Sequence, residues 1–476
     1  ITPVSAQTPA PPERPAVGPE RPFQLAPRVE RTLPNGLRVI VTRQMVVPKV
    51  TVMLTVLSGY AEDPRELTGL AALTADGVQE GTKTRNSREI RRLAFSIGGS
   101  LSAGVSQDFT SLSLRGLAEF TPQMIDLVSD VAINPVFPAD EVAILKQQRL
   151  QGVAQQKSSP QAVANRQFRR QLFGDHPYAR TSETEASVQA IDRSKIEAFH
   201  RDHYRPDNAF LLVVGAVEPD AVISSAEKSF GPWKRFASTS ASNPSTESVR
   251  SVLVPGPPPD PTPPDRHLFF VQRPNSVQSS IALGNLAVKR SDARWYELTL
   301  ANTVFGGAFN SRIIRNIRED KGYTYSPSST LNGFADAGFY RLAADVRNEV
   351  TGATLVEVFK EIDKMRAEGS DGSELQGGKQ YMRGLFSIQT ATQSGLANTL
   401  NSVYVFGLAK DYPETFRSKI AAVTPTQVKT AASTLLDPAH TVVVVVGDYT
   451  KVKEQLAQFG AITFLDLDGN KISAPQ

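Results

Sequence analysis

Cysteine is absent from the 476-residue sequence, and histidine is scarce, with five residues in the whole chain. Without a thiol, the chain has no thiolate metal ligand, no cysteine nucleophile and no disulfide bond. The few histidines leave few candidates for a zinc ligand or a general base. Chemistry that depends on cysteine is therefore excluded, and a metal site has few residues to draw on.

Long hydrophobic runs are absent as well. The longest, Phe210–Val214 and Thr441–Val446, are short and bounded by turn residues. A helix that spans a membrane needs roughly 18 apolar residues, whereas short apolar runs between turns are typical of buried strands. We therefore expect no membrane span.

Charge of one sign does not gather anywhere, because 52 Lys and Arg residues are interspersed with 48 Asp and Glu residues. A protein that binds nucleic acid usually has clustered cations with interleaved aromatic residues, and neither an RNA-binding signature nor a zinc-finger spacing is present. Nucleic acid is therefore not an expected partner. The sequence also lacks a Gly-x-Ser-x-Gly elbow, a Walker loop and a dinucleotide fingerprint, which argues against serine hydrolases, nucleotide hydrolases and dehydrogenases.

Proline-rich stretches divide the chain into two halves. A domain usually holds roughly 100–200 residues, so this length predicts more than one. Residues 1–28 are rich in proline and poor in periodic apolar positions, and we expect a disordered leader. A second proline-rich stretch within residues 237–265 predicts an extended linker. The rest of the sequence predicts an N-terminal domain over 29–236, a C-terminal domain over 266–462 and a tail over 463–476.

Each half follows the same order of predicted elements and ends in an apolar strand followed by glycine, Ala209–Gly215 and Thr441–Gly447. In the first half, strands Val29–Thr32 and Leu37–Thr42 flank an Asn-Gly turn, which is a hairpin signal. The predicted fold class is α+β, with two similar domains, each a mainly antiparallel sheet packed by helices. The other predicted strands are Val50–Leu57, Ser279–Leu286 and Gly338–Val346, and the predicted helices are Leu67–Gln79, Thr121–Ile133, Ala139–Gln156, Gln161–Leu172, Ala293–Phe305, Ser311–Asp320, Thr354–Arg366 and Ser373–Gln389.

A short motif near the start of the chain bears on its location. Val4-Ser5-Ala6 resembles the small-residue cleavage site that closes a secretory signal peptide. On that interpretation Ile1 lies inside a signal peptide, and the mature protein is periplasmic or secreted. The alternative is that Ala6 is an ordinary residue of a flexible leader.

Two histidines lie close enough in the sequence to share a metal ion. His200 and His203 are three residues apart at the end of a predicted helix, a spacing that zinc ligands use. No suitably placed Glu follows, and Tyr204-Arg-Pro206 ends the helix, so we expect capping or surface roles instead. His176 precedes a proline in a predicted loop, where a structural role is expected.

Several short motifs carry a resemblance that covers nearly all of Val29–Gly460. In chain order they are Leu33–Val41, Gly59–Pro64, Gly69–Ala71, Glu80–Thr82, Ile97–Ala103, His176–Tyr178 and Tyr204–Asn208. Together they resemble the pitrilysin/insulinase and mitochondrial-processing-peptidase family of zinc peptidases. The resemblance implies two homologous processing-peptidase-like domains.

The resemblance also locates the zinc motif of that family, His-x-x-Glu-His, on a helix of the first half. Its two histidines hold zinc and its glutamate activates the metal-bound water. The matching positions here are Ala72, Ala75 and Asp76. The remaining ligand of the family is a Glu on a later helix, yet no Asp or Glu lies between Glu141 and Asp175. The resemblance therefore implies that this chain holds no zinc of its own.

In the second half, Ile317–Ser326 resembles the Arg-Tyr substrate element of the same family. Arg318 lies at the end of a predicted helix, and Tyr325 lies past a turn on the next predicted strand, so that both side chains can converge. By resemblance they bind the substrate carbonyl and stabilise the oxyanion that develops opposite zinc. The alternative is that Arg318 pairs with Glu319 or Asp320 and that Tyr325 only packs.

The substrate strand of the family has a counterpart at Leu101, Ser102, Ala103 and Gly104. By resemblance, this edge strand binds an extended peptide through main-chain hydrogen bonds, which suit many sequences. The alternative is an ordinary strand end.

Together these features predict a non-zinc subunit of a heterodimeric zinc peptidase that hydrolyses peptides or unfolded polypeptides. The chain would supply Arg318 and Tyr325, and zinc would be held by a homologous partner subunit that carries the intact motif. One alternative is a catalytically inactive peptide-binding or scaffold protein. Another is an active homomeric metallopeptidase, for which cleavage by the purified chain should be sensitive to chelators.

Overall fold

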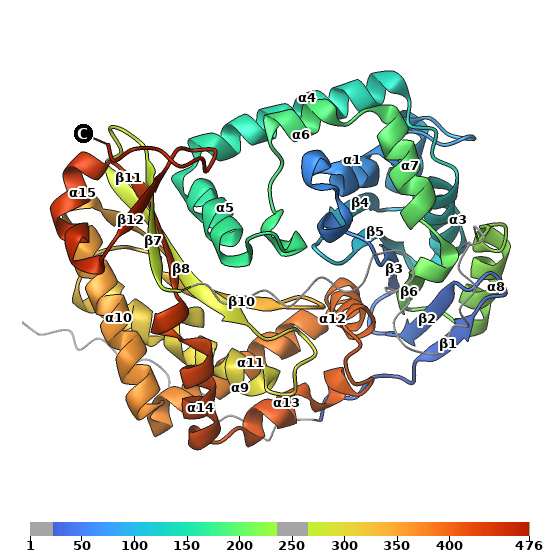
Figure 1. Cartoon of the computed structure of the whole chain (residues 1–476). Helices are drawn as coiled ribbons and strands as arrows, with labels where there is room; N and C mark the ends of the chain where they lie inside the picture. The colour runs from blue at the N-terminus through green and yellow to red at the C-terminus, as the bar shows by residue number, and fades with distance from the viewer. Residues whose placement is uncertain (1–21, 236–264, 476) are drawn as a thin grey trace, which may run out of the picture.

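The computed structural model describes residues 22–235 and 265–475 (Figure 1). Most of the predicted leader over 1–28 and nearly all of the predicted linker over 237–265 lie outside these residues. Pro22–Arg28 is described and contacts the folded chain, because the ring of Phe23 lies 5.8 Å from that of Phe386 and the Arg28 guanidinium pairs with Glu414 at 3.6 Å. No helix in the described ranges is long and apolar enough to cross a membrane.

The first half builds a six-stranded sheet in the order β1-β2-β6-β3-β5-β4. All neighbouring strands are antiparallel except β2 and β6, which are parallel. The strands are β1 (Val29–Thr32), β2 (Arg38–Arg43), β3 (Lys49–Val56), β4 (Ser100–Val105), β5 (Thr110–Leu117) and β6 (Ala209–Gly215).

The second half builds a corresponding sheet in the order β12-β7-β11-β8-β10-β9. The β12–β7 and β7–β11 pairs are parallel and the rest are antiparallel. The prediction of an α+β fold with mainly antiparallel sheets is confirmed. The β2–β6 and β7–β11 pairs are parallel because the last apolar strand of each half returns after a long helical crossover. The strands are β7 (His267–Gln272), β8 (Gln278–Ala287), β9 (Ser328–Gly333), β10 (Gly338–Arg347), β11 (Val442–Gly447) and β12 (Ile462–Leu465).

The predicted tail over 463–476 begins inside a strand. β12 pairs with β7, and Leu465 is buried against the second sheet. The short alternating run at 462–465 gives too weak a signal to be recognised without its neighbour strand.

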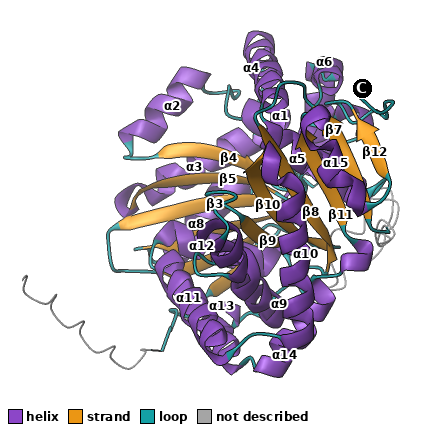
Figure 2. Cartoon of the chain, turned by 90° about the vertical axis from the view of Figure 1, so that its left-hand side faces the viewer, coloured by secondary structure: helices purple, strands orange, loops and turns teal. Residues whose placement is uncertain are grey.

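Helices cover both sheets (Figure 2). The boundary between α4 and α5 has a local cause, because Pro160 cannot continue a helix but can begin one, and the Ser159 hydroxyl accepts a hydrogen bond from the N–H of Ala162. The helices are α1 (Leu70–Gly77), α2 (Ser87–Ser96), α3 (Thr121–Ile133), α4 (Ala139–Ser158), α5 (Pro160–Phe173), α6 (Glu185–Ala190), α7 (Arg193–His203), α8 (Pro219–Phe230), α9 (Trp295–Asn302), α10 (Thr351–Glu368), α11 (Gly372–Thr390), α12 (Gln393–Val405), α13 (Tyr412–Ala422), α14 (Pro425–Leu435) and α15 (Tyr449–Leu456), with π-helical segments η7 (Thr303–Gly307) and η8 (Ile314–Asp320).

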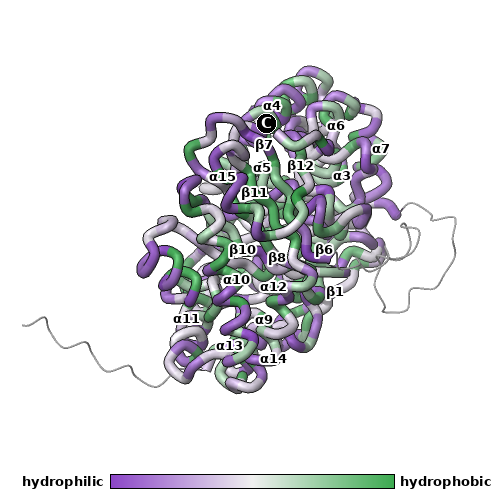
Figure 3. The backbone as a smooth tube through the Cα atoms, turned by 60° about the vertical axis from the view of Figure 1, so that its left-hand side comes forward, coloured by the Kyte–Doolittle hydropathy of each residue, from purple (hydrophilic) through white to green (hydrophobic). Residues whose placement is uncertain are grey.

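Each half covers the sheet of the other half with one helix. α5 packs Phe168 and its neighbours against β8 and β11, in a cluster that includes Ala282 and Val444. α12 packs Leu400 against the first sheet, next to Leu212. Hydrophobic residues are accordingly concentrated in central strands such as β8 and β11 (Figure 3). The two domains therefore share buried apolar surface.

Candidate catalytic and peptide-binding site

The helix that carries Ala72, Ala75 and Asp76, α1, is fixed at its start by Asp63. This buried carboxylate accepts hydrogen bonds from the N–H of Gly69 at 2.7 Å and of Ala71 at 2.8 Å. Gly69 has φ +104°, a left-handed conformation that favours glycine. Burial raises the pKa of Asp63 to about 7, although both amides act against this. The carboxylate thus caps the helix N-terminus, where an acidic group is favoured.

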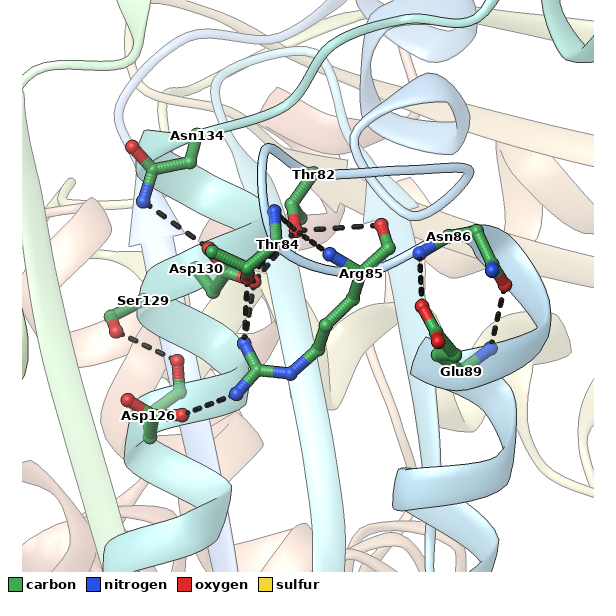
Figure 4. A network of polar contacts seen from close by, with 9 residues as sticks. All are labelled: Thr82, Thr84, Arg85, Asn86, Glu89, Asp126, Ser129, Asp130 and Asn134. Carbon is green, nitrogen blue, oxygen red and sulfur yellow. Dashed lines mark hydrogen bonds and ion pairs between the residues drawn. The ribbon is translucent and has the colours of Figure 1, made fainter.

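The loop after α1 is fixed by a second carboxylate, Asp130 on α3 (Figure 4). Asp130 accepts hydrogen bonds from the hydroxyls of Thr82 at 2.7 Å and Thr84 at 3.0 Å, and it pairs with Arg85 at 2.6 Å. Burial opposes ionisation of Asp130, yet these donors hold its pKa below the ordinary value. The segments on both sides of α1 are therefore anchored by charged hydrogen bonds.

The positions that the resemblance aligns with the zinc motif, Ala72, Ala75 and Asp76, contain one member of an ion pair. Ala72 and Ala75 are buried, and Asp76 at the end of α1 pairs with the guanidinium of Arg149 on α4. The same guanidinium pairs with Glu183 at 2.9 Å. Arg149 therefore lies between two carboxylates.

Arg149 is the counter-ion of this cluster and sets one positive charge against two carboxylates. Burial acts against the charged guanidinium, but Asp76 and Glu183 raise the pKa of Arg149 above its ordinary value. Burial raises the pKa of Glu183, and Arg149 acts in the opposite direction. A guanidinium is protonated throughout the pH range of proteins, so the two carboxylates have a permanent counter-ion.

These residues do not fit a zinc ion. A catalytic zinc site needs three donor side chains and an open position for water. The two alanines offer no donor atom, and both carboxylates are already bound to a cation. Across residues 22–235 and 265–475, no group of three or more His, Cys, Asp or Glu side chains is arranged to hold a metal.

Sequence reasoning identified Ala72, Ala75 and Asp76 but missed Arg149 and Glu183. Arg149 lies in the stretch between Glu141 and Asp175 that lacks acidic residues. The missing acidic ligand of this stretch was recognised, but Arg149 itself was not. No sequence signal pointed to Glu183, because it lies on a loop that only the tertiary fold brings to α1.

The predicted substrate strand is the outermost strand of the first sheet. β4 contains Leu101–Gly104 and, in the described part of the chain, pairs with β5 alone. The N–H of Ser106 donates to the carbonyl of Phe109 at 2.8 Å at the end of this ladder. Because bonded and non-bonded pairs alternate in an antiparallel ladder, the N–H groups of Leu101 and Ala103 point away from β5. This free edge lies beside α1; its use by a substrate stays a prediction.

Arg318 and Tyr325 lie in the second half, near the outer end of its sheet. Arg318 is half-buried in η8, with its guanidinium 5.0 Å above the ring of Phe309. Tyr325 is 91% exposed. In the described residues, no ion pair links Arg318 to Glu319 or Asp320, and no hydrogen bond links it to Tyr325. The structure therefore leaves both side chains accessible but does not bring them into contact.

The placement of Tyr325 on a strand was wrong. Tyr325 lies in the loop between η8 and β9, and the strand begins only at Ser328. Pro327 explains the difference, because proline has no N–H to donate to a sheet ladder. The turn at Gly322 is present, with φ +62°.

The backbone that carries Arg318 is held by buried polar contacts. Arg312 pairs with Glu374 on α11 at 2.6 Å, and Asn316 donates to Glu361 on α10 at 2.9 Å. The π-helical winding of η8 was not expected from the sequence. Segments of this kind are frequent at functional sites.

The histidines have structural roles, and two of them are more buried than expected. The ring of His200 lies 2.8 Å from the carbonyl of Ala132, and burial lowers its pKa to about 4. His203 contacts the Ser58 hydroxyl at 3.0 Å. Both histidines lie in the last turn of α7, as the expected capping role requires, but their rings contact other elements rather than lying free on the surface.

Comparisons with known families and relatives agree with this geometry. Residues 38–185 match the insulinase (peptidase family M16) model, and residues 190–382 match the peptidase M16 inactive domain model. An uncharacterized zinc protease of Mycobacterium tuberculosis is 28% identical over 345 residues, which cover 72% of this chain and 74% of that protein. The uncharacterized zinc protease YmxG of Bacillus subtilis is 22% identical over 384 residues, covering 78% of this chain and 87% of that protein.

Solved structures show the same fold. The peptidase M16 inactive domain from Pseudomonas fluorescens superposes with a TM-score of 0.78 at 24% identity, covering 88% of this chain and 98% of that chain. A protease from Helicobacter pylori superposes with a TM-score of 0.80 at 17% identity, covering 88% and 99%. With two matched domain models in one polypeptide, the chain belongs to the M16 (insulinase) family of peptidases.

Proposed function

We propose that this chain is the non-zinc subunit of a two-chain zinc peptidase. The observation that carries the proposal is Arg149, which binds Asp76 and Glu183 where the zinc motif of the family would lie. This cluster has no place for a catalytic metal, whereas Arg318 and Tyr325 remain accessible to a substrate. The chain therefore contributes substrate-binding groups, and a homologous partner contributes zinc and the general base.

Arg318 and Tyr325 act on the carbonyl of the peptide bond that is cleaved. Hydrolysis turns this carbonyl oxygen into an oxyanion as water adds to the carbon. Guanidinium and phenol N–H and O–H groups donate hydrogen bonds to that oxygen, and their contribution grows as negative charge develops. Their role is therefore catalytic rather than only binding.

The free edge of β4 selects the form of the substrate. A segment that pairs with this edge must be extended and must have its own main-chain N–H and C=O groups free. Short peptides and unfolded polypeptides meet this condition, whereas compact folded proteins do not. The substrate class is therefore flexible polypeptide.

The test begins with the tagged chain purified from its own cell and mass spectrometry of the proteins that co-purify in near one-to-one amount. We expect a homologous partner with an intact His-x-x-Glu-His motif. In the reconstituted pair, Arg318→Ala and Tyr325→Phe should each lower kcat by about 10²–10³-fold, the usual effect of removing an oxyanion donor. The matched controls are Arg347→Ala and Tyr381→Phe, which change exposed side chains of the second half outside the Arg-Tyr element. Unchanged turnover in both site variants would contradict the proposal.

A second candidate is a catalytically inactive peptide-binding or scaffold protein. The free edge of β4 beside a metal-free helix supports it equally. This candidate predicts that the isolated chain binds extended peptides and that no zinc-bearing partner co-purifies. An active homomeric peptidase instead predicts chelator-sensitive cleavage by the isolated chain, and the Arg149 cluster argues against it.

A further inference from the structure

A cavity of about 400 Å³ lies between α5 and the strands β8 and β10 of the second sheet. Figure 1 shows α5 beside this sheet. The volume of the cavity falls in the range of small-ligand sites. Polar side chains from both halves line it, namely Gln161, Asn165, Ser280, Ser326, Arg341 and Asp345.

The cavity lies next to the Arg-Tyr element. Ser326, which lines it, directly follows Tyr325 in the chain, and Ser328 at the start of β9 lines it as well. Ser328 is opposite Ala343 in the β9–β10 ladder. When a peptide binds at Tyr325, one of its neighbouring side chains or its chain end can therefore reach this cavity.

The negative charge in the cavity is already satisfied. Asp345 accepts a hydrogen bond from the Ser280 hydroxyl at 2.6 Å through one carboxylate oxygen. Its other oxygen accepts one from the side-chain amide of Gln161 at 2.8 Å. Each oxygen of Asp345 therefore has a donor within the protein.

The guanidinium of Arg341, in contrast, has no anionic partner among the described residues. The guanidinium of Arg341 donates only to the neutral side chain of Asn165, and no carboxylate pairs with it in the described residues. Its Nε is buried without a hydrogen-bond partner. Burial lowers the pKa of Arg341, because no anion compensates for the loss of water. Asp345 lies four residues along the same strand, with its Cα about 13 Å from that of Arg341, and in the described residues no ion pair joins the two side chains.

We propose that this cavity binds a carboxylate of the bound peptide, with Arg341 as its partner. The inference rests on the proposed function, because it requires that an extended peptide binds the chain. A guanidinium binds a carboxylate through two parallel hydrogen bonds. The carboxylate comes either from an acidic side chain or from the C-terminus of the peptide. Arg341 thus determines specificity.

The experiment measures peptide binding by fluorescence anisotropy with the full chain. The probes are extended neutral peptides that carry Glu or Gln at one position in turn, each with a free or an amidated C-terminus. We expect at least tenfold tighter binding either for one Glu peptide than for its Gln counterpart, or for peptides with a free C-terminus than for amidated ones. The comparison that shows this difference identifies the source of the carboxylate.

Arg341→Gln should abolish the preference and leave the affinity for neutral amidated peptides within about twofold. Asn165→Asp is a second variant, because it places a carboxylate on α5 against an intact Arg341 and should abolish the preference as well. The matched control is Arg347→Gln, an exposed arginine on the same strand that does not line the cavity.

Three results overturn the inference. If neutral peptides bind but the acidic ones gain nothing, or if the gain persists in Arg341→Gln and Asn165→Asp, the cavity does not bind a carboxylate, while the proposed function stands. If no peptide binds at all, the inference fails, whereas the proposed function is judged separately by the partner that co-purifies and by the turnover of Arg318→Ala and Tyr325→Phe in the reconstituted pair.

Discussion

At the scale of single residues, Arg149 places a permanent positive charge between Asp76 and Glu183. In a metal site that charge would come from the ion and would depend on metal supply and pH. Here it is part of the chain and needs neither. The arginine therefore both stabilises α1 against α4 and removes the need for a cation.

Replacing Arg149 with Gln should destabilise the fold, because two carboxylates then lose their counter-ion. We expect the free energy of unfolding, measured by urea denaturation, to fall by about 2–3 kcal/mol, less than the ~3–5 kcal/mol lost when a fully buried pair is broken, because the side chains of Arg149 and Asp76 are 26% and 34% exposed. The matched control is Arg65→Gln, since Arg65 and Asp175 form a pair whose side chains are 71% and 94% exposed. That variant should change stability by no more than about 1 kcal/mol. Equal effects of the two substitutions would contradict this account of the cluster.

At the scale of elements, the free edge of β4 is the feature that connects the fold with peptide binding. The edge is available because β4 is the outermost strand of the first sheet, and α1 packs beside that strand. An exposed edge of this kind is a template for another strand.

Ala103→Pro tests that edge. Proline removes an N–H that points away from β5, so the ladder within the protein keeps its hydrogen bonds while an added strand loses one. We expect an extended peptide to bind at least about tenfold more weakly, with the circular dichroism spectrum unchanged. Ala103→Val, which keeps the N–H, is the control and should bind as the natural chain does. Equal binding by both variants would show that the peptide lies elsewhere.

Elements with strong local signals could be predicted from the sequence. β6 and β11 are continuous apolar runs between turn residues, and the hairpin of β1 and β2 is marked by its Asn-Gly turn. β12 and the π-helical winding of η8 depend on a neighbour strand and on the polar anchors Arg312 and Asn316, and these could not be predicted. Ala72 and Asp76 could be found by position, whereas Glu183 could not, because only the tertiary fold brings it to Arg149.

At the scale of the whole molecule, the halves exchange helices. α5 from the first half closes the second sheet, and α12 from the second half closes the first. Neither sheet is fully covered without the other half. The halves should therefore unfold together.

The two tryptophans allow this to be measured, because Trp233 lies in the first half and Trp295 in the second. In Trp233→Phe, Trp295 reports on the second half, and in Trp295→Phe, Trp233 reports on the first half. We expect coincident urea transitions from the two reporters. Phe168→Ala on α5 should lower the midpoint of both, with a loss of about 3–5 kcal/mol for a fully buried aromatic residue. Separate midpoints, or a shift of one reporter alone, would contradict a shared core.

The central claim is that this chain does not itself hold the catalytic metal. The most direct test is the zinc content of the isolated full chain, measured by elemental mass spectrometry after incubation with zinc and removal of the free ion. The account predicts no stoichiometric zinc, because Asp76 and Glu183 are both already paired with Arg149 and the two alanines offer no ligand. A full equivalent of tightly bound zinc in the isolated chain would contradict it.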